Sequence, residues 1–143
     1  MGQCYNSIVV DAPASEVWSA LRNFHDMSWA AGVIESLDVV GDKGAFEAGA
    51  RRLLNGVFAE TLIDLDDESK TIRYSIDDGP GPMATTEVAS YEGRAQVFPI
   101  TTTDQSFVLW TSEYKANDEA AVGELCNPIY HALLAALAAH FAG

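Results

Sequence analysis

The sequence predicts an α+β fold in which a curved antiparallel sheet of about six or seven strands wraps round one long C-terminal helix. Apolar residues recur at three- and four-residue steps over 119–141, which is typical of an amphipathic helix. Short segments over 33–115 are rich in β-branched and aromatic residues and are separated by turn residues, as in antiparallel strands. Two helical segments over 14–31 follow a first strand, so we expect two short helices there.

The N-terminal elements are a strand over 5–10 and a helix over 14–24. Pro13 stands near the helix start, where its missing N–H has little effect. Residues 25–31 are expected to form the second short helix, which Gly32 ends. The first helix has one apolar face, formed by Val17, Trp18, Leu21 and Phe24.

The middle of the chain is predicted to form a series of strands. Asn55-Gly56 between two of them is a strong signal for a tight hairpin. Gly93 lies inside another strand, where it could allow the sheet to bend. Residues 1–143 are expected to form one domain. The expected strands cover 33–40, 50–54, 57–65, 70–77, 85–98 and 105–115.

The single long helix predicts a cavity. A helix that covers a strongly curved sheet cannot close against it along its whole length, and the gap at one end is a natural site for a small molecule. The apolar stripe of this helix consists of Val122, Leu125, Cys126, Ile129, Tyr130, Leu133, Leu134, Leu137 and Phe141.

The composition of the chain limits the classes of partner that the protein can bind. The 143 residues include 21 acidic and 8 basic side chains, a formal charge of −13, which disfavours nucleic acid. The longest apolar stretch, over 129–142, is too short for a membrane span and carries His131 and His140. Two cysteines without a C-x-x-C motif, and no signal-peptide pattern, indicate a reduced, cytoplasmic protein. Metal-binding, nucleotide-binding and nucleophile-elbow motifs are absent from the sequence, so we expect no metal and no cofactor.

Several short patterns resemble one family. The pattern V-x-A-P-x-x-x-V-W-x-x-L occurs at Val10, Ala12, Pro13, Val17, Trp18 and Leu21, and Trp29 follows it. A G-x-x-R pattern occurs at Gly49 to Arg52. Further matches are Tyr74-Ser75-Ile76, Gly81-Pro82-Met83, Tyr91, Val108, Trp110 and Tyr114. In this order and spacing, over about 5–141, the chain resembles the START-like SRPBCC superfamily, and within it the polyketide cyclase/dehydrase-like branch.

The resemblance implies a helix-grip fold with a hydrophobic cavity. It does not imply one activity, because the superfamily includes lipid carriers, hormone-binding proteins, aromatase/cyclases and proteins without a known ligand. In the resemblance, Arg52 takes the place of the family's arginine.

Arg52 and Glu60 are the first candidates for chemistry. Adjacent Arg51 and Arg52 point to opposite faces, so at most one of them is inside. An inward Arg52 could anchor a carboxylate or enolate, whereas an outward one would pair with an acidic neighbour. Both Arg52 and Glu60 flank the Asn55-Gly56 turn, so an inward Glu60 could pair with Arg52 and act as a general base.

The remaining candidates are aromatic and apolar side chains, together with two histidines. His131 and His25 could transfer protons, although for His131 a surface histidine is the simpler interpretation. For the aromatic residues, packing in the core is the alternative to a role in the cavity. With Arg52, the predicted ligand-binding residues are Trp29, Tyr74, Ile76, Tyr91, Trp110, Tyr130 and Leu134.

Three functions remain open. The first is a carrier or sensor that binds an apolar or amphipathic small molecule such as a lipid. The second is a polyketide cyclase or dehydratase that uses Arg52, Glu60, Tyr74 and His131, and an Arg52 within hydrogen-bond reach of Glu60 or a tyrosine would favour it. The third is a co-chaperone-like module that binds protein through an exposed apolar patch. A homodimer through an edge strand or the outer sheet face is compatible with each.

Overall fold

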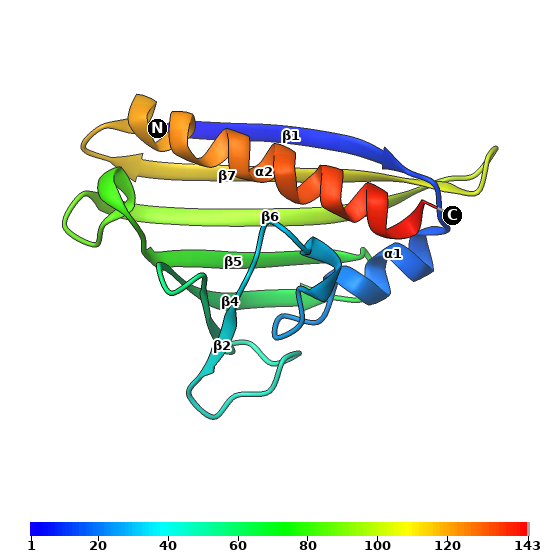
Figure 1. The fold of residues 1–143 in the computed structure, drawn as a ribbon, viewed down its shortest axis with the longest axis horizontal. Coiled ribbons are helices and arrows are strands. Elements are labelled where there is room, and N and C mark those ends of the chain that lie inside the picture. Colours follow the sequence, from blue (N-terminus) through cyan, green and yellow to red (C-terminus); the bar gives the residue numbers. More distant parts are fainter. Residues whose placement is uncertain (143) are drawn as a thin grey trace.

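A seven-stranded sheet, in the order β1-β7-β6-β5-β4-β3-β2, forms the centre of the computed structural model, which describes residues 1–142. Neighbouring strands are antiparallel throughout. Figure 1 shows the long helix α2 (Glu119–Phe141) lying across the sheet, which confirms the predicted fold class. The strands are β1 (Gly2–Val10), β2 (Leu37–Val40), β3 (Arg51–Leu54), β4 (Phe58–Asp66), β5 (Thr71–Asp78), β6 (Val88–Ile100) and β7 (Gln105–Ala116).

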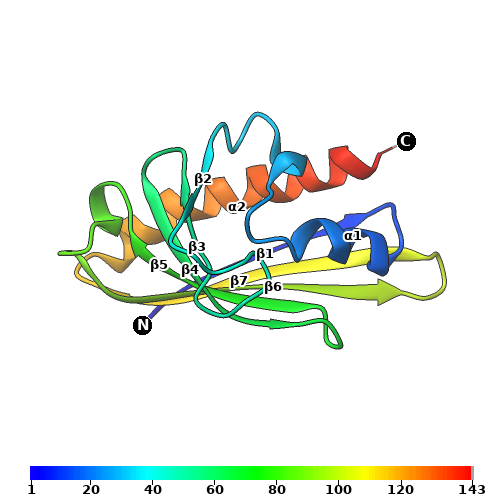
Figure 2. The same cartoon turned by 90° about the horizontal axis from the view of Figure 1, so that it is seen from below.

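Helix α2 forms a second layer on the inner face of the sheet (Figure 2). The Asp118 carboxylate caps its start by accepting a hydrogen bond from the Ala121 backbone N–H. Within residues 1–142, α2 is the one helix long and apolar enough to cross a membrane by length and composition alone. Its inward side chains are buried in the core, namely Val122, Cys126, Tyr130, Leu133, Leu134 and Leu137.

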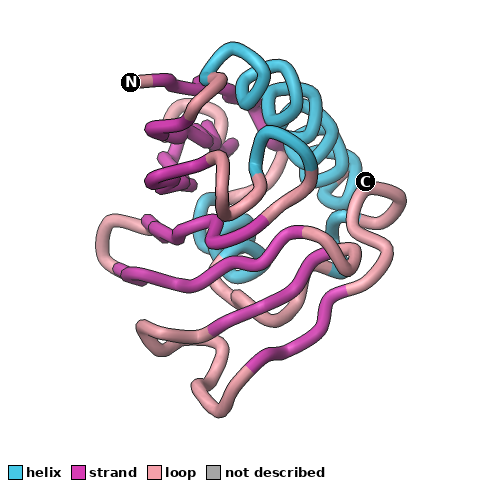
Figure 3. The backbone as a smooth tube through the Cα atoms, turned by 90° about the vertical axis from the view of Figure 1, so that its left-hand side faces the viewer, coloured by secondary structure: helices cyan, strands magenta, loops and turns pink. Residues whose placement is uncertain are grey.

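The sheet curves round α2, as the view along its strands in Figure 3 shows. Register shifts, the mark of β-bulges, occur twice in β4, at Ala59/Glu60 and Leu62/Asp64, and once near the start of β6. Such bulges bend strands. The register at Gly93 is regular, with Tyr74 opposite it on β5 and Ser112 on β7, so no bulge occurs at the glycine for which a bend was predicted.

The two short helices are smaller than expected. Helix α1 (Ala14–Leu21) ends before Phe24, and the second helix is a single 3-10 turn, η1 (Ser28–Ala30). The intervening backbone bonds to side chains instead: the His25 N–H donates to the Asn23 carboxamide and the Ser28 N–H to the Asp26 carboxylate. Such local bonds compete with a helix. Another 3-10 turn, η2 (Gly81–Met83), lies between β5 and β6.

The strand predicted over 33–40 is shorter in the structure, where only 37–40 pair with β3. The side chain of Asn55 accounts for the difference. The Asn55 side chain accepts hydrogen bonds from the backbone N–H groups of Glu35 and Ser36 and donates one to the Val33 carbonyl. These bonds hold 33–36 beside the β3–β4 turn, away from a strand ladder. In that turn Asn55 and Gly56 both have positive φ angles, as a type I′ turn requires, and the pairing of Leu54 with Phe58 leaves three residues, 55–57, in the loop.

Candidate functional site

A cavity of about 100 Å³ lies between α2, the inner faces of β3, β4, β5 and β7, and the segment 27–34. Most of its wall is apolar, from Met27, Val33, Ile34, Leu54, Phe58, Ile76, Cys126, Ile129 and Leu133. Its polar lining comes from Arg52, Asn55, Glu60, Tyr74, Trp110 and Tyr130. The cavity is therefore apolar with a few polar groups, as small-molecule sites are.

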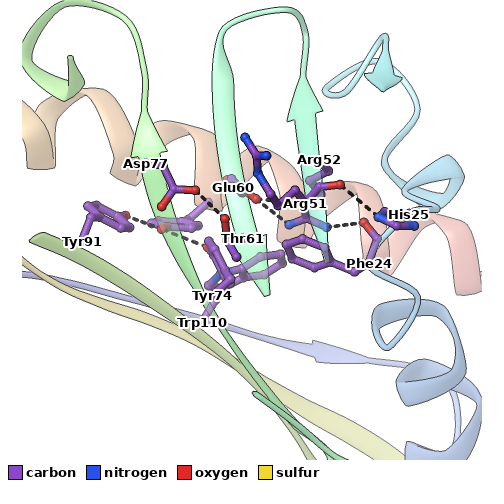
Figure 4. Close-up of polar contacts among 11 residues, drawn as sticks. Phe24, His25, Arg51, Arg52, Glu60, Thr61, Tyr74, Asp77, Tyr91 and Trp110 are labelled. Carbon is purple, nitrogen blue, oxygen red and sulfur yellow. Dashed lines mark hydrogen bonds and ion pairs between the residues drawn. The ribbon is translucent and has the colours of Figure 1, made fainter. Parts of the chain in front are cut away.

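Arg52 and Glu60 form a buried ion pair at one side of the cavity (Figure 4). The two residues are direct partners in the β3–β4 register, so both point to the inner face. Arg52 donates from Nε (2.9 Å) and Nη2 (2.7 Å), both to Oε1 of Glu60. Arg52 is 4% and Glu60 6% exposed. This pair satisfies the condition that would favour a proton-transfer enzyme.

The Arg52 guanidinium is held from two further directions. Its Nη1 donates to the Phe24 carbonyl oxygen at 3.1 Å, and its centre lies 3.8 Å from the centroid of the Phe24 ring. Neighbouring Arg51 is exposed, and its carbonyl oxygen lies 3.0 Å from Nε2 of His25. Glu60 thus occupies the Nε–Nη2 edge of Arg52, which is the edge that could otherwise anchor the ligand carboxylate expected from the sequence.

The two carboxylate oxygens of Glu60 differ in their partners. Its Oε1 receives both bonds from Arg52, whereas its Oε2 accepts no hydrogen bond from any residue within 1–142. Within that range the fully buried side-chain polar atom without a partner is Ser112 Oγ, so Oε2 of Glu60 is not sealed from solvent. Removal from water raises the pKa of the Glu60 carboxyl, and the positive charge of Arg52 opposes this effect. The result is an acceptor oxygen without a partner on a residue that lines the cavity.

A hydrogen-bonded aromatic cluster lies beside the ion pair. Trp110 donates from its indole nitrogen to the Tyr74 hydroxyl at 2.8 Å, and the Tyr74 hydroxyl lies 3.3 Å from that of Tyr130. The Tyr130 hydroxyl also bonds to the Tyr91 hydroxyl. Burial raises the pKa of all three tyrosines above the ordinary value, so they are neutral at physiological pH.

Only some of the predicted site residues line the cavity. Arg52, Glu60, Tyr74, Ile76, Trp110 and Tyr130 do, and β-strand register and the inner face of α2 bring them together. Trp29, Tyr91 and Leu134 are buried but stand behind the lining, with Trp29 next to the Trp110 ring at 6.4 Å between centroids.

His131 does not belong to the site. It is exposed, whereas its neighbour Tyr130 is buried. Successive side chains on a helix differ by about 100° in direction, so only one of the two can face the sheet. His131 therefore does not line the cavity, in line with the simpler interpretation of a surface histidine.

The sequence reasoning missed several lining residues. Cys126, Ile129 and Leu133 stand on the apolar stripe of α2, and the stripe itself was the signal that could have found them. Burial raises the pKa of the Cys126 thiol to about 11, so it is an uncharged wall residue. Met27, Val33 and Ile34 come from irregular backbone that no periodicity marks. No group of three or more metal-ligating side chains occurs in the described part of the chain.

The comparisons with known proteins agree with this geometry. A protein from Nitrosospira multiformis has a solved structure that is 45% identical, with a TM-score of 0.95 over 99% of this chain and 97% of the other. Norcoclaurine synthase from Thalictrum flavum, solved in complex with dopamine and hydroxybenzaldehyde, is 18% identical, with a TM-score of 0.73 over 96% of this chain and 84% of that one. Ginseng major latex-like protein 151 from Panax ginseng is 14% identical, with a TM-score of 0.77 over 99% and 98%.

At such low identity, the two plant proteins show the fold alone. No curated protein matches the chain. The family described as polyketide cyclase / dehydrase and lipid transport matches residues 1–142. This match confirms the family resemblance seen in the sequence, and the similar solved structures confirm the helix-grip fold. The chain belongs to the polyketide cyclase / dehydrase and lipid transport family.

Proposed function

We propose that this protein binds an apolar or amphipathic small molecule in the cavity between the sheet and α2, as a carrier or sensor. One observation carries the proposal: the wall of the cavity is mostly apolar, and its polar part includes a charge-balanced group, the Arg52–Glu60 pair. Apolar walls supply most of the binding free energy in such sites, and a few polar groups orient the ligand.

The volume sets the size of the buried part of the ligand. An apolar cavity of about 150 Å³ holds a benzene molecule, so a volume of about 100 Å³ encloses less than one whole ring without rearrangement, and the rest of a ligand lies outside it. A longer lipid would extend past the half-buried Val33, Ile34 and Phe58 toward solvent. The same volume is too small for a peptide segment, so the co-chaperone hypothesis has no support from the cavity.

The setting of the site supports a soluble, cytoplasmic protein. The inward face of α2 packs on the sheet, which supports α2 as a core helix and not a membrane span. Cys4 and Cys126 are both free and buried, in line with a reducing compartment. A homodimer stays a prediction; β1 and β2 are the edge strands available for it.

A second candidate function is proton-transfer catalysis of the cyclase or dehydratase kind. The observation that favours it is Glu60, whose Oε2 is unpartnered in the described structure and whose pKa burial raises. A carboxylate with a raised pKa beside an apolar cavity suits a general base. Turnover of a bound ligand would separate this function from carriage.

Native mass spectrometry of gently purified protein tests the first proposal, followed by extraction and identification of any bound compound. The matched variants are Ile129→Trp, which fills the cavity wall, and Ile63→Trp, on an exposed position of β4 outside the cavity. We expect Ile129→Trp to lose the compound and Ile63→Trp to keep it. Equal retention by both variants, confirmed in solution with the purified compound, would show that the cavity is not the site.

A further inference from the structure

The polar side of the cavity is already balanced in charge. Arg52 carries one positive and Glu60 one negative charge, and both are almost fully buried. Three donor directions of Arg52 are occupied, two by Oε1 of Glu60 and one by the Phe24 carbonyl oxygen. An anionic ligand group would place a second negative charge beside Glu60 in a site with little water, which is unfavourable.

The tyrosine beside the pair is also engaged. The Tyr74 hydroxyl accepts from Trp110 and is bonded to the Tyr130 hydroxyl, so it has little capacity left for a ligand. Glu60 Oε2 is different, because no residue within 1–142 donates to it. Because Glu60 lines the cavity, an Oε2 that no side chain or backbone N–H in this range uses is free to accept a hydrogen bond from a ligand.

We propose that the occupant of this cavity presents a neutral hydroxyl group, as in a phenol or an alcohol, and that this hydroxyl donates to Oε2 of Glu60. The inference rests on the proposed function, since it names the chemical class of the ligand for the same cavity. A neutral hydroxyl leaves the pair charge-balanced, whereas a carboxylate does not. The volume of about 100 Å³ encloses the hydroxyl and part of one ring, and the rest of the ligand extends past Val33, Ile34 and Phe58 toward solvent.

Four ring compounds of nearly equal shape test this proposal: 4-propylphenol, 4-propylanisole, 4-propylbenzoate and propylbenzene. Only the phenol is a neutral donor at pH 7; the anisole can only accept, and the benzoate is charged. Calorimetric titration of the wild-type protein gives the four affinities. We expect the phenol to bind at least about tenfold more tightly than each of the others, because a hydrogen bond to a charged group is worth that much.

The results of this titration distinguish a failure of the hydroxyl proposal from a failure of the proposed binding function. A phenol that binds no better than the anisole, or a benzoate that binds best, would overturn the hydroxyl proposal and leave the cavity as a binding site. If none of the four compounds binds, propylbenzene included, the proposed function itself fails and the hydroxyl proposal with it.

The variant Glu60→Gln supplies a second measurement. Arg52 still needs an acceptor, so the carboxamide oxygen stays with Arg52 and its NH₂ group, a donor, takes the place of Oε2. We expect the phenol to lose its advantage over the anisole, while propylbenzene binds as before. An unchanged advantage would contradict donation to Oε2. If the variant does not fold, the wild-type series alone decides.

Discussion

Tyr74 lies over Gly93. The two residues are opposite each other on β5 and β6, and a Cβ atom built on Gly93 would stand 2.2 Å from Cζ of the Tyr74 ring. No side chain fits in that space, so the glycine is what allows the ring to lie flat on the sheet. In this position the Tyr74 hydroxyl reaches both Trp110 and Tyr130. The missing side chain at position 93 thus helps to shape the cavity wall.

Replacing this glycine should destabilise the protein. Gly93→Ala would force the Tyr74 ring out of place and break its bond with Trp110, and overpacking of this kind costs about 1–3 kcal/mol or more. The free energy of unfolding from urea titrations measures the loss.

The control is a double-mutant cycle with Tyr74→Ala. Since the clash is with the Tyr74 ring, Gly93→Ala should cost much less when residue 74 is alanine. If the two effects simply add, the contact between Gly93 and Tyr74 does not account for the loss.

The Arg52–Glu60 pair predicts an asymmetric response to mutation. Glu60→Leu leaves the Arg52 charge buried without a partner and should lower the free energy of unfolding by about 3–5 kcal/mol. The double variant Arg52→Met/Glu60→Leu should be close to wild type in stability, because it removes both buried charges. Urea titrations compare all three proteins.

The chain contains a matched control. Arg73 and Glu92 form a pair of the same N–O distance, 2.7 Å, but both side chains are partly exposed. Glu92→Leu should therefore cost only up to about 1 kcal/mol. If Glu60→Leu and Glu92→Leu lowered the free energy of unfolding equally, burial of the Arg52–Glu60 pair would not explain its effect.

Asn55 should control the mobility of one cavity wall. Its side chain holds the backbone of Val33, Glu35 and Ser36. Asn55→Gly keeps the positive φ angle of the turn but removes these bonds. We expect the Glu35 and Ser36 amides to exchange with solvent much faster in this variant, as measured by hydrogen exchange. Amides of β6 serve as the reference, and unchanged exchange at Glu35 and Ser36 would contradict the role.

The buried tyrosines predict a loss of stability in alkali. Burial raises the pKa of Tyr74, Tyr91 and Tyr130 in the folded protein, while the unfolded chain ionises its tyrosines near pH 10. Above that pH the folded state holds more protons than the unfolded state, so the free energy of unfolding falls as pH rises. Urea titrations between about pH 8 and pH 11 measure the slope. Tyr91→Phe removes one such group and should reduce it; the same slope in both proteins would count against the explanation.

The sequence by itself determined the features that depend on local chain geometry. The periodicity of 119–141 predicted α2, alternation and turn residues predicted the strands, and ordered motifs indicated the family. Asn55-Gly56 defined a tight turn, and a tight turn fixes which residues face each other. The sequence placed Arg52 and Glu60 on either side of that turn, but a two-residue turn would pair Arg52 with Ala59; the three-residue loop 55–57, seen only in the structure, pairs Arg52 with Glu60.

Only the tertiary structure decided how distant elements meet. Whether Tyr91 lines the cavity or stands behind Tyr130 depends on how α2 is rotated on the sheet, and this rotation also turns His131 outward. Val33 and Ile34, in an irregular segment, line the wall where the Asn55 side chain bonds to the backbone of Val33 and Glu35. Such contacts join residues far apart in the chain and follow from packing complementarity, which no periodicity in the sequence encodes.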